Sequence, residues 1–326
     1  MCFPGFYRAL VTRRKGLLVV LALILILAAT VGLAWTPFLK AFHAHQEEEV
    51  LDEPIKGKLM RIRLPSRTLR RTNTVFVYLP PNYDAKDSPY PVVYLLHGFP
   101  GEARDWFVKG QAHITTERKI LAGNIPPMIL VSFDAAGPNG PHDATQFLNR
   151  PDGKCSVEDY VTRELPEQIE SRYNADNRPE GRALIGLSSG GYGAVNIGMK
   201  HPDIFRVLVS HSGFFQLADD ASATKRWLGP NRVLWDVNDP FKKAGDWNKD
   251  TELHLYLDCG KSDDLLDENV RFSKRLGQLG IDHIFKAYPG SHHWSYWSKH
   301  FADSIQFTGD RLVKLRQSEN AGGKVD

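Results

Sequence analysis

The chain has 326 residues, 42% of them hydrophobic, so it can bury one large core. Its formal charge of +3 includes five basic and no acidic residues before position 41, so the remainder carries a net charge of −2. That balance excludes a strongly basic surface of the kind that binds nucleic acid, and we expect no nucleic-acid partner.

The first element is an apolar run. Residues 16–35 have Thr30 as their only polar member and follow Arg13, Arg14 and Lys15. A helix of this length rises about 30 Å, the thickness of the hydrocarbon layer. We therefore predict residues 1–15 in the cytoplasm, a transmembrane anchor over 16–35 and the rest outside. The alternative is a secreted protein whose signal segment is cleaved near the small residues at 32–34.

The stretch from 36 to 57 is polar without a strand pattern, and we predict a linker there. Export would place Cys155 and Cys259 in an oxidising compartment, where they could form a disulfide. Two separate buried thiols are the alternative.

Strands and helices alternate from residue 58 onward. Apolar and basic residues alternate over 59–64, and the apolar run 74–80 follows after a polar turn, which indicates an antiparallel pair at a sheet edge. The later strands are nearly all apolar, as expected of a sheet covered on both faces. They are expected at 91–96, 128–133, 182–185, 206–210, 253–258 and 283–288. The fold class predicted for 58–316 is α/β, with a mostly parallel central sheet, helices on both faces and a flexible tail at 317–326.

A glycine-rich turn joins the strand at 182–185 to a helical pattern. Its sequence, Gly186-Leu187-Ser188-Ser189-Gly190, fits G-x-S-x-G, in which a sharp turn pushes the serine hydroxyl out of the sheet. Only Ser188 has glycine two places before and two places after it. A turn of this kind can also bind phosphate. We predict Ser188 as a nucleophile.

A second loop, at 97–101, follows the strand at 91–96. Acyl transfer places negative charge on a carbonyl oxygen, which backbone N–H groups stabilise. We expect one donor from Phe99 and one from Ser189, the residue after the nucleophile. His97 precedes the serine in the chain and is predicted to be structural.

The acid and the base are expected after the last two strands. Asp263 is placed to orient an imidazole, with Asp264 as the second choice and Asp258 as a structural residue. His292 and His293 lie on a glycine-containing loop, and either can be the base. No spaced cysteine or carboxylate accompanies them, so we predict no metal and no cofactor.

Two segments can shape a substrate pocket. The loop at 134–154 is long enough to form one wall. The region 214–250 is rich in aromatic residues and has little regular pattern. It is either an insertion over the site or ordinary packing.

Four motifs together resemble the putative esterase family of α/β-hydrolases. The family includes esterase D, feruloyl esterases, enterochelin esterases and the antigen 85 mycolyltransferases. The motifs are Leu95-Leu96-His97-Gly98, Gly186 to Gly191, Cys259 to Asp263 and His292 to Trp297, and the likeness covers about 58–313. The resemblance implies an α/β-hydrolase fold.

The same resemblance implies residue roles. It favours His292 over His293 as the base, Asp263 as the acid, and the amides of Phe99 and Ser189 as oxyanion donors. Many members carry methionine where this chain has Ser189, which leaves the backbone donor in place. Many relatives also have tryptophan at the position of Trp106, which is expected to pack the oxyanion loop. Trp106 and Trp294 are also the candidate substrate-binding residues.

The sequence therefore predicts an exported, membrane-anchored serine esterase that hydrolyses a small carboxylic ester through an acyl-enzyme on Ser188. One alternative is an acyltransferase that passes the acyl group to a sugar hydroxyl, as mycolyltransferases do. Another is a non-catalytic binding module on a hydrolase fold.

Overall fold

The computed structural model describes residues 49–51, 54–140, 142–217, 225, 227–247 and 251–322. The predicted cytoplasmic segment 1–15, the predicted anchor 16–35 and most of the predicted linker lie outside these residues. Within the described part, no helix combines the length and the apolar character that crossing a membrane requires. The anchor therefore stays a prediction.

A nine-stranded sheet forms the centre of the unit that starts at Glu49. Its order is β1-β2-β3-β5-β4-β6-β7-β8-β9. The first four strands in this order pair antiparallel, and β5-β4-β6-β7-β8-β9 pair parallel. The strands are β1 (Glu49–Leu51), β2 (Lys58–Ser66), β3 (Arg71–Leu79), β4 (Val92–Leu96), β5 (Ile129–Phe133), β6 (Arg182–Leu187), β7 (Val207–His211), β8 (His254–Gly260) and β9 (His283–Tyr288). The predicted antiparallel pair at the edge is β2 with β3.

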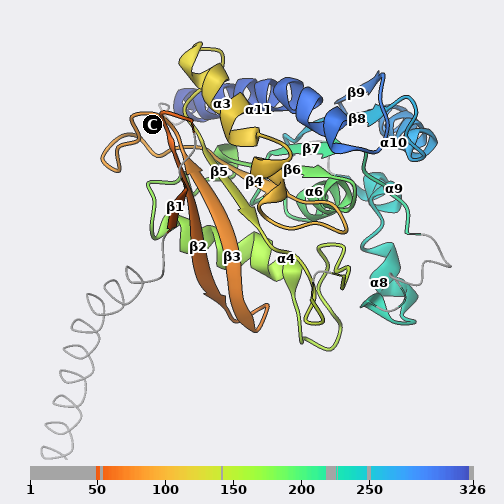
Figure 1. The fold of residues 1–326 in the computed structure, drawn as a ribbon. Helices are drawn as coiled ribbons and strands as arrows, with labels where there is room; N and C mark the ends of the chain where they lie inside the picture. The colour runs from red at the N-terminus through yellow and green to blue at the C-terminus, as the bar shows by residue number, and fades with distance from the viewer. Residues whose placement is uncertain are drawn as a thin grey trace, which may run out of the picture. The chain divides into compact units, whose positions relative to one another are not determined.

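Helices cover both faces of this sheet, as the apolar strands predict. Figure 1 shows α3 and α11 on one side and α4 and α6 on the other. The helices are α2 (Asp105–Val108), α3 (Ala112–Leu121), α4 (Val157–Asp159), α5 (Leu165–Glu170), α6 (Ser189–Lys200), α8 (Arg232–Asp236), α9 (Pro240–Lys243), α10 (Leu266–Gln278) and α11 (Trp294–Gly322). A π-helical stretch (Tyr160–Glu164) joins α4 to α5, and 3₁₀ turns span Pro179–Gly181 and Ala244–Asp246.

Two hydrophobic cores lie on opposite faces of the sheet, because successive side chains of a strand point to opposite sides. In β4, Tyr94 and Leu96 join the core that α6 and α10 cover. Val93 and Leu95 join the core that α2, α3 and α11 cover. Burial on both faces is what makes the parallel strands apolar throughout.

Three expectations need correction. β1 pairs antiparallel with β2, so the predicted linker 36–57 contains a short strand. α11 continues to Gly322 and so extends into the predicted tail. Cys155 and Cys259 are both buried and unpaired, so the proposed disulfide is wrong and the alternative of two separate thiols holds. Cys155 packs in the core beside α4, whereas Cys259 lies in β8.

A fully buried contact between a histidine and a carboxylate joins the end of β7 to β8. His211 Nδ1 lies 2.8 Å from Asp258 Oδ2, and both side chains are 0% exposed. Tyr296 of α11 donates its hydroxyl to Asp258 at 3.1 Å, and Ser304 Oγ lies 3.0 Å from His211 Nε2. Burial, together with the charge of Asp258, raises the pKa of Tyr296, so this phenol stays a donor. The pair therefore ties α11 to two adjacent strands.

Removing Asp258 should destabilise the fold. We expect Asp258→Ala to lower the free energy of unfolding by about 3–5 kcal/mol, because it leaves His211 buried without its partner. Urea unfolding measures the change. Asp203→Ala, at an exposed loop position, is the control and should shift it by less than about 0.5 kcal/mol. Equal effects of the two substitutions would contradict the structural role of Asp258.

Candidate active site

Ser188 occupies a sharp turn between β6 and α6. Its φ of 53° and ψ of −121° are rare for a residue with a side chain. Such a conformation costs on the order of 1–3 kcal/mol and persists only where its surroundings hold it. Here the Ser188 amide donates to the His211 carbonyl at 2.8 Å, and the Ser188 carbonyl accepts from Tyr192 at 3.0 Å. The turn is thus anchored to β7 and to α6.

The glycines at 186 and 190 are a steric requirement of this turn. A Cβ on Gly186 would lie 1.9 Å from the carbonyl oxygen of Gly190, and one on Gly190 would lie 2.1 Å from that of Leu96. Both obstacles are backbone atoms, which cannot move aside as a flexible side chain can. The spacing that identifies Ser188 in the sequence therefore has a direct structural cause.

The structure brings Ser188, His292 and Asp263 into one hydrogen-bonded row. His292 Nε2 lies 2.9 Å from Ser188 Oγ, and His292 Nδ1 lies 3.0 and 3.1 Å from the two Asp263 oxygens. A carboxylate only accepts, so Nδ1 carries the proton, and in the neutral ring Nε2 then accepts from the serine hydroxyl. Asp263 follows β8, and His292 lies on the loop between β9 and α11.

The environment keeps Asp263 ionised. Its side chain is 0% exposed, whereas that of His292 is 37% exposed. Burial by itself would raise the pKa of Asp263, but hydrogen bonds from His292, from the Leu265 amide and from Ser212 outweigh it and lower the pKa. A carboxylate held in this way can orient the imidazole and stabilise its positive charge. Asp264, the second choice from the sequence, is exposed.

Ser212 and Trp297 support the acid and the base. The sequence pointed to Trp297 only as the end of the motif that begins at His292, and it gave no indication of Ser212. Ser212 is buried with a φ of 50°, follows β7, and contacts Asp263 through its hydroxyl. The indole N–H of Trp297 donates to Ser212 Oγ at 3.1 Å. The Trp297 ring also packs edge-on against His292, with centroids 4.9 Å apart. A serine after a strand carries no signal of such a role.

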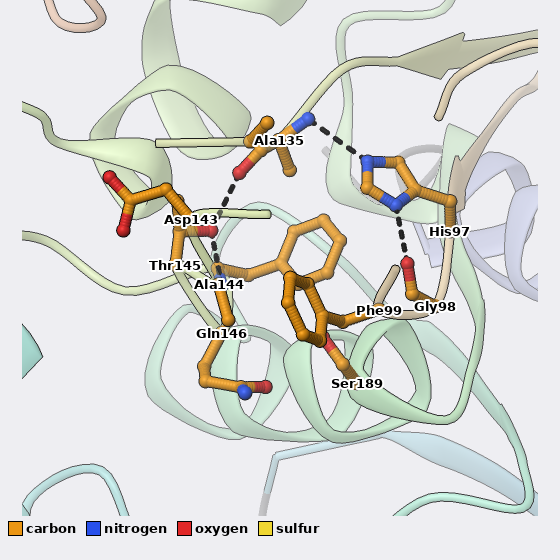
Figure 2. A pocket seen from close by; sticks show the side chains of 11 residues that line it. His97, Gly98, Phe99, Ala135, Asp143, Ala144, Thr145, Gln146 and Ser189 are labelled. Atoms are coloured by element: carbon orange, nitrogen blue, oxygen red, sulfur yellow. Dashed lines mark hydrogen bonds between the residues drawn. The ribbon is translucent and has the colours of Figure 1, made fainter. Parts of the chain in front are cut away.

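His97 holds the loop that contains Phe99. Its Nδ1 lies 2.7 Å from the Gly98 carbonyl, and its Nε2 accepts from the Ala135 amide at 3.0 Å (Figure 2). Burial lowers the pKa of His97, which favours the neutral ring that this pattern needs. His97 therefore links the loop after β4 to the loop after β5, in keeping with the structural role predicted for it.

A hollow opens beside the nucleophile turn. Phe99 and Ser189, the predicted oxyanion residues, both line it, together with residues 143–147 of the loop after β5 (Figure 2). Gly98 packs so closely on the turn that a Cβ there would lie 2.7 Å from Leu187 Cδ1. Ser189 is the first residue of α6, so its amide lies at the positive end of that helix dipole.

One proposed substrate contact is wrong. Trp106 is 0% exposed, and its ring packs against His211, Trp294 and Phe301, so it cannot reach a substrate. Trp294 is half-buried at the start of α11, two residues after His292, and stays a candidate.

The aromatic residues of 214–250 mostly serve packing in the part of that region that the structure describes. Phe215 stacks on Phe272 with centroids 4.1 Å apart, and Phe214 stacks on Tyr192. Trp227 and Trp235 belong to the core that α6 covers. Ordinary packing, the second of the two alternatives, accounts for these four residues.

The two buried cysteines are poor nucleophiles. Burial, helped by the charge of Asp263, raises the pKa of the Cys259 thiol to about 12, and burial also raises that of Cys155. A thiol reacts as its thiolate, so Ser188 is the better nucleophile near neutral pH. Across the described ranges, no three His, Cys, Asp or Glu side chains are grouped so that they could hold a metal ion.

Comparisons with known proteins agree with this geometry. The family model described as "Putative esterase" matches residues 66–308. An acetyl esterase of Caldicellulosiruptor saccharolyticus is 24% identical over 272 residues, which cover 76% of this chain and 97% of that protein. Esterase MT1326 of Mycobacterium tuberculosis (strain CDC 1551 / Oshkosh) is 28% identical over 67% of this chain, which spans 52% of that longer protein. The solved structure of a ferulic acid esterase superposes with a TM-score of 0.69 at 26% identity, covering 79% of this chain and 99% of that one.

Two glycine-to-alanine substitutions test the steric requirement at the turn, one at the turn and one in open space. Gly190→Ala should lower the free energy of unfolding by about 3 kcal/mol, since its Cβ would meet the backbone of Leu96. Gly277→Ala, in α10 with no atom within 4 Å of the new Cβ, should raise it by about 0.5–1 kcal/mol. Urea unfolding of both variants measures the difference, and an unchanged stability of Gly190→Ala would contradict the close approach.

Proposed function

Because the chain belongs to the Esterase family, we propose that it is a serine esterase that cleaves a carboxylic ester through an acyl-enzyme on Ser188. The observation that carries the proposal is the hydrogen-bonded row from Asp263 through His292 to Ser188, next in the chain to Ser189, which lines a hollow together with Phe99. A family name alone would not assign chemistry to these residues.

In the first half of the reaction, Ser188 Oγ attacks the carbonyl carbon of the ester. His292 Nε2 takes the hydroxyl proton, and Asp263 stabilises the resulting imidazolium. The negative charge on the carbonyl oxygen is held by the amides of Phe99 and Ser189, the latter at the start of α6. His292 then gives its proton to the leaving alcohol, and the acyl group stays on Ser188.

In the second half, water takes the place of the alcohol. His292 removes a proton from the water, the hydroxide adds to the acyl carbon, and the same amides stabilise the second oxyanion. Return of the proton to Ser188 Oγ releases the carboxylic acid. The 37% exposure of the His292 side chain is consistent with access of water to this atom.

We infer further that residues 16–35 anchor the enzyme in a membrane, with the catalytic unit outside the cytoplasm. The apolar run and the basic residues before it support this location. Fractionation of cells that express the full chain tests it, since a chain found only in the soluble fraction would contradict an uncleaved anchor.

Loss of the nucleophile should abolish turnover. For the full chain in detergent, we expect Ser188→Ala to lower kcat for p-nitrophenyl acetate by about 10⁴-fold or more. A fluorophosphonate probe should label the wild type, and mass spectrometry should locate the label on Ser188. Ser171→Ala, at an exposed serine after α5, should retain wild-type turnover and labelling. Unchanged turnover in Ser188→Ala would refute the mechanism.

Asp263 and Asp264 provide a matched pair of neighbours. Asp263→Asn should lower kcat by about 10⁴-fold, because an amide does not hold the imidazole in the required tautomer. Asp264→Asn, on an exposed side chain, should change kcat less than about twofold.

The pH profile gives a further check on Asp263. Its pKa is lowered from the ordinary aspartate value, so the carboxylate stays ionised throughout the range above that value. The contribution of Asp263 to kcat/KM should therefore be fully present above the ordinary pKa of an aspartate and be lost only as the pH falls below it. An equal loss of kcat in Asp263→Asn and Asp264→Asn, or a loss of the Asp263 contribution well above the ordinary pKa of an aspartate, would contradict these roles.

A further inference from the structure

Gln146 places an unused acceptor beside the proposed reaction centre. Its side chain lines the hollow, on the wall that residues 143–147 form (Figure 2). Its Oε1 is buried and has no hydrogen-bond partner among the described residues. Burying an acceptor without a partner is unfavourable, so such groups in native proteins call for an explanation. A ligand that donates to this oxygen would provide one.

The backbone around Gln146 is held firmly. Gln146 and Phe147 both have positive φ, 52° and 58°, and strain of this kind collects at functional sites. The hydroxyl of Thr145 donates to the Ala135 carbonyl at 2.7 Å and accepts from the Phe147 amide at 3.1 Å. Phe147 itself is buried against α6, where a Cβ on Gly193 would lie 2.8 Å from its ring. The carboxamide is therefore presented from a fixed loop.

The lining residues assign the hollow to the acyl side of the ester. The leaving oxygen must receive its proton from His292 Nε2, so the alcohol lies towards His292. Both oxyanion residues, Phe99 and Ser189, line the hollow, whereas neither Ser188 nor His292 does. A substrate group that reaches the hollow is therefore carried by the carbonyl carbon, next to the oxyanion donors, rather than by the leaving oxygen beside His292.

The size and the polarity of the hollow restrict which acyl group can reach it. The room for a water-sized group in the hollow is about 10 Å³, which is enough for roughly one hydroxyl or water and not for a longer chain. Ala135, Ala136 and Ala144 supply small side chains to the lining. Asp143 also lines the hollow, and its Oδ2 accepts from the amide and the carboxamide of Asn139. Gln146 Oε1 is the buried side-chain acceptor among the described lining residues that has no partner.

We propose that Gln146 determines acyl specificity by accepting a hydrogen bond from a hydroxyl on a short acyl chain, so that the preferred substrates are esters of short hydroxy acids. This inference rests on the proposed esterase function. A site built to hydrogen-bond a substrate hydroxyl discriminates against an analogue that lacks it, because the buried partner is then left unpaired.

Matched pairs of esters of one alcohol test the proposal. Glycolate is compared with propionate, and 3-hydroxybutyrate with 3-methylbutyrate, so that a hydroxyl replaces a methyl group at nearly constant size. For the wild-type full chain, we expect kcat/KM to favour the hydroxy acid at least tenfold in one of the pairs. The ratio within a pair cancels effects of a variant on enzyme concentration or on the chemical step.

Two variants separate the roles of the carboxamide. Gln146→Met keeps the length but removes the acceptor, and it should reduce the hydroxy-to-methyl ratio to about one. Gln146→Glu keeps an acceptor but removes the amide donor, and it should retain the preference. Gln278→Leu, which replaces an exposed glutamine at the end of α10, is the control and should keep the hydroxy-to-methyl ratio of the wild type. Thermal unfolding verifies that each variant is folded.

The possible results distinguish the role of Gln146 from the esterase function on which it rests. Hydrolysis of all four esters with ratios near one in the wild type overturns the role of Gln146 and leaves the esterase function standing. Loss of the preference in Gln146→Glu, or a preference for methoxyacetate over glycolate, overturns the assignment of Oε1 as the acceptor. Failure to hydrolyse any of the esters overturns the proposed function and this inference with it.

Discussion

The turn at Ser188 is the constraint around which the rest of the site is built. The close approach of Gly186 to Gly190, and of Gly190 to Leu96, leaves room only for hydrogen at both glycine positions. The turn thereby projects the serine hydroxyl beyond the sheet. Its strain is offset by packing of α6 on the sheet and by the hydrogen bond to the His211 carbonyl. A nucleophile on a flexible loop would lose this fixed direction.

The parallel order of the strands explains how distant residues meet. β4, β6, β8 and β9 run in the same direction, so the loops after them emerge at one edge of the sheet. These loops carry Phe99, Ser188, Asp263 and His292. The buried pair of His211 and Asp258 fixes the spacing of β7 and β8 below that edge and ties α11 to them. Packing beneath the site therefore sets the distances within it.

The fold class and the family were predictable because they depend on local patterns. Apolar runs of strand length imply a covered sheet, and the glycine spacing around Ser188 follows from backbone sterics. The family inferred from four motifs is confirmed by the match over 66–308. Where a prediction depended on side-chain direction, the sequence carried no such signal. Trp106 proved buried, Cys155 and Cys259 are both buried and unpaired, and neither Ser212 nor Gln146 belongs to a recognisable motif.

Backbone strain is concentrated at this edge of the molecule. Of the seven non-glycine residues with positive φ in the described chain, four surround the site: Gln146, Phe147, Ser188 and Ser212. Each costs on the order of 1–3 kcal/mol, a sum comparable with the net stability of a typical domain. The two cores on either face of the sheet must offset that cost. Core substitutions far from Ser188 can thus lower activity, because they allow these loops to relax even though none of the residues that perform the chemistry has been replaced.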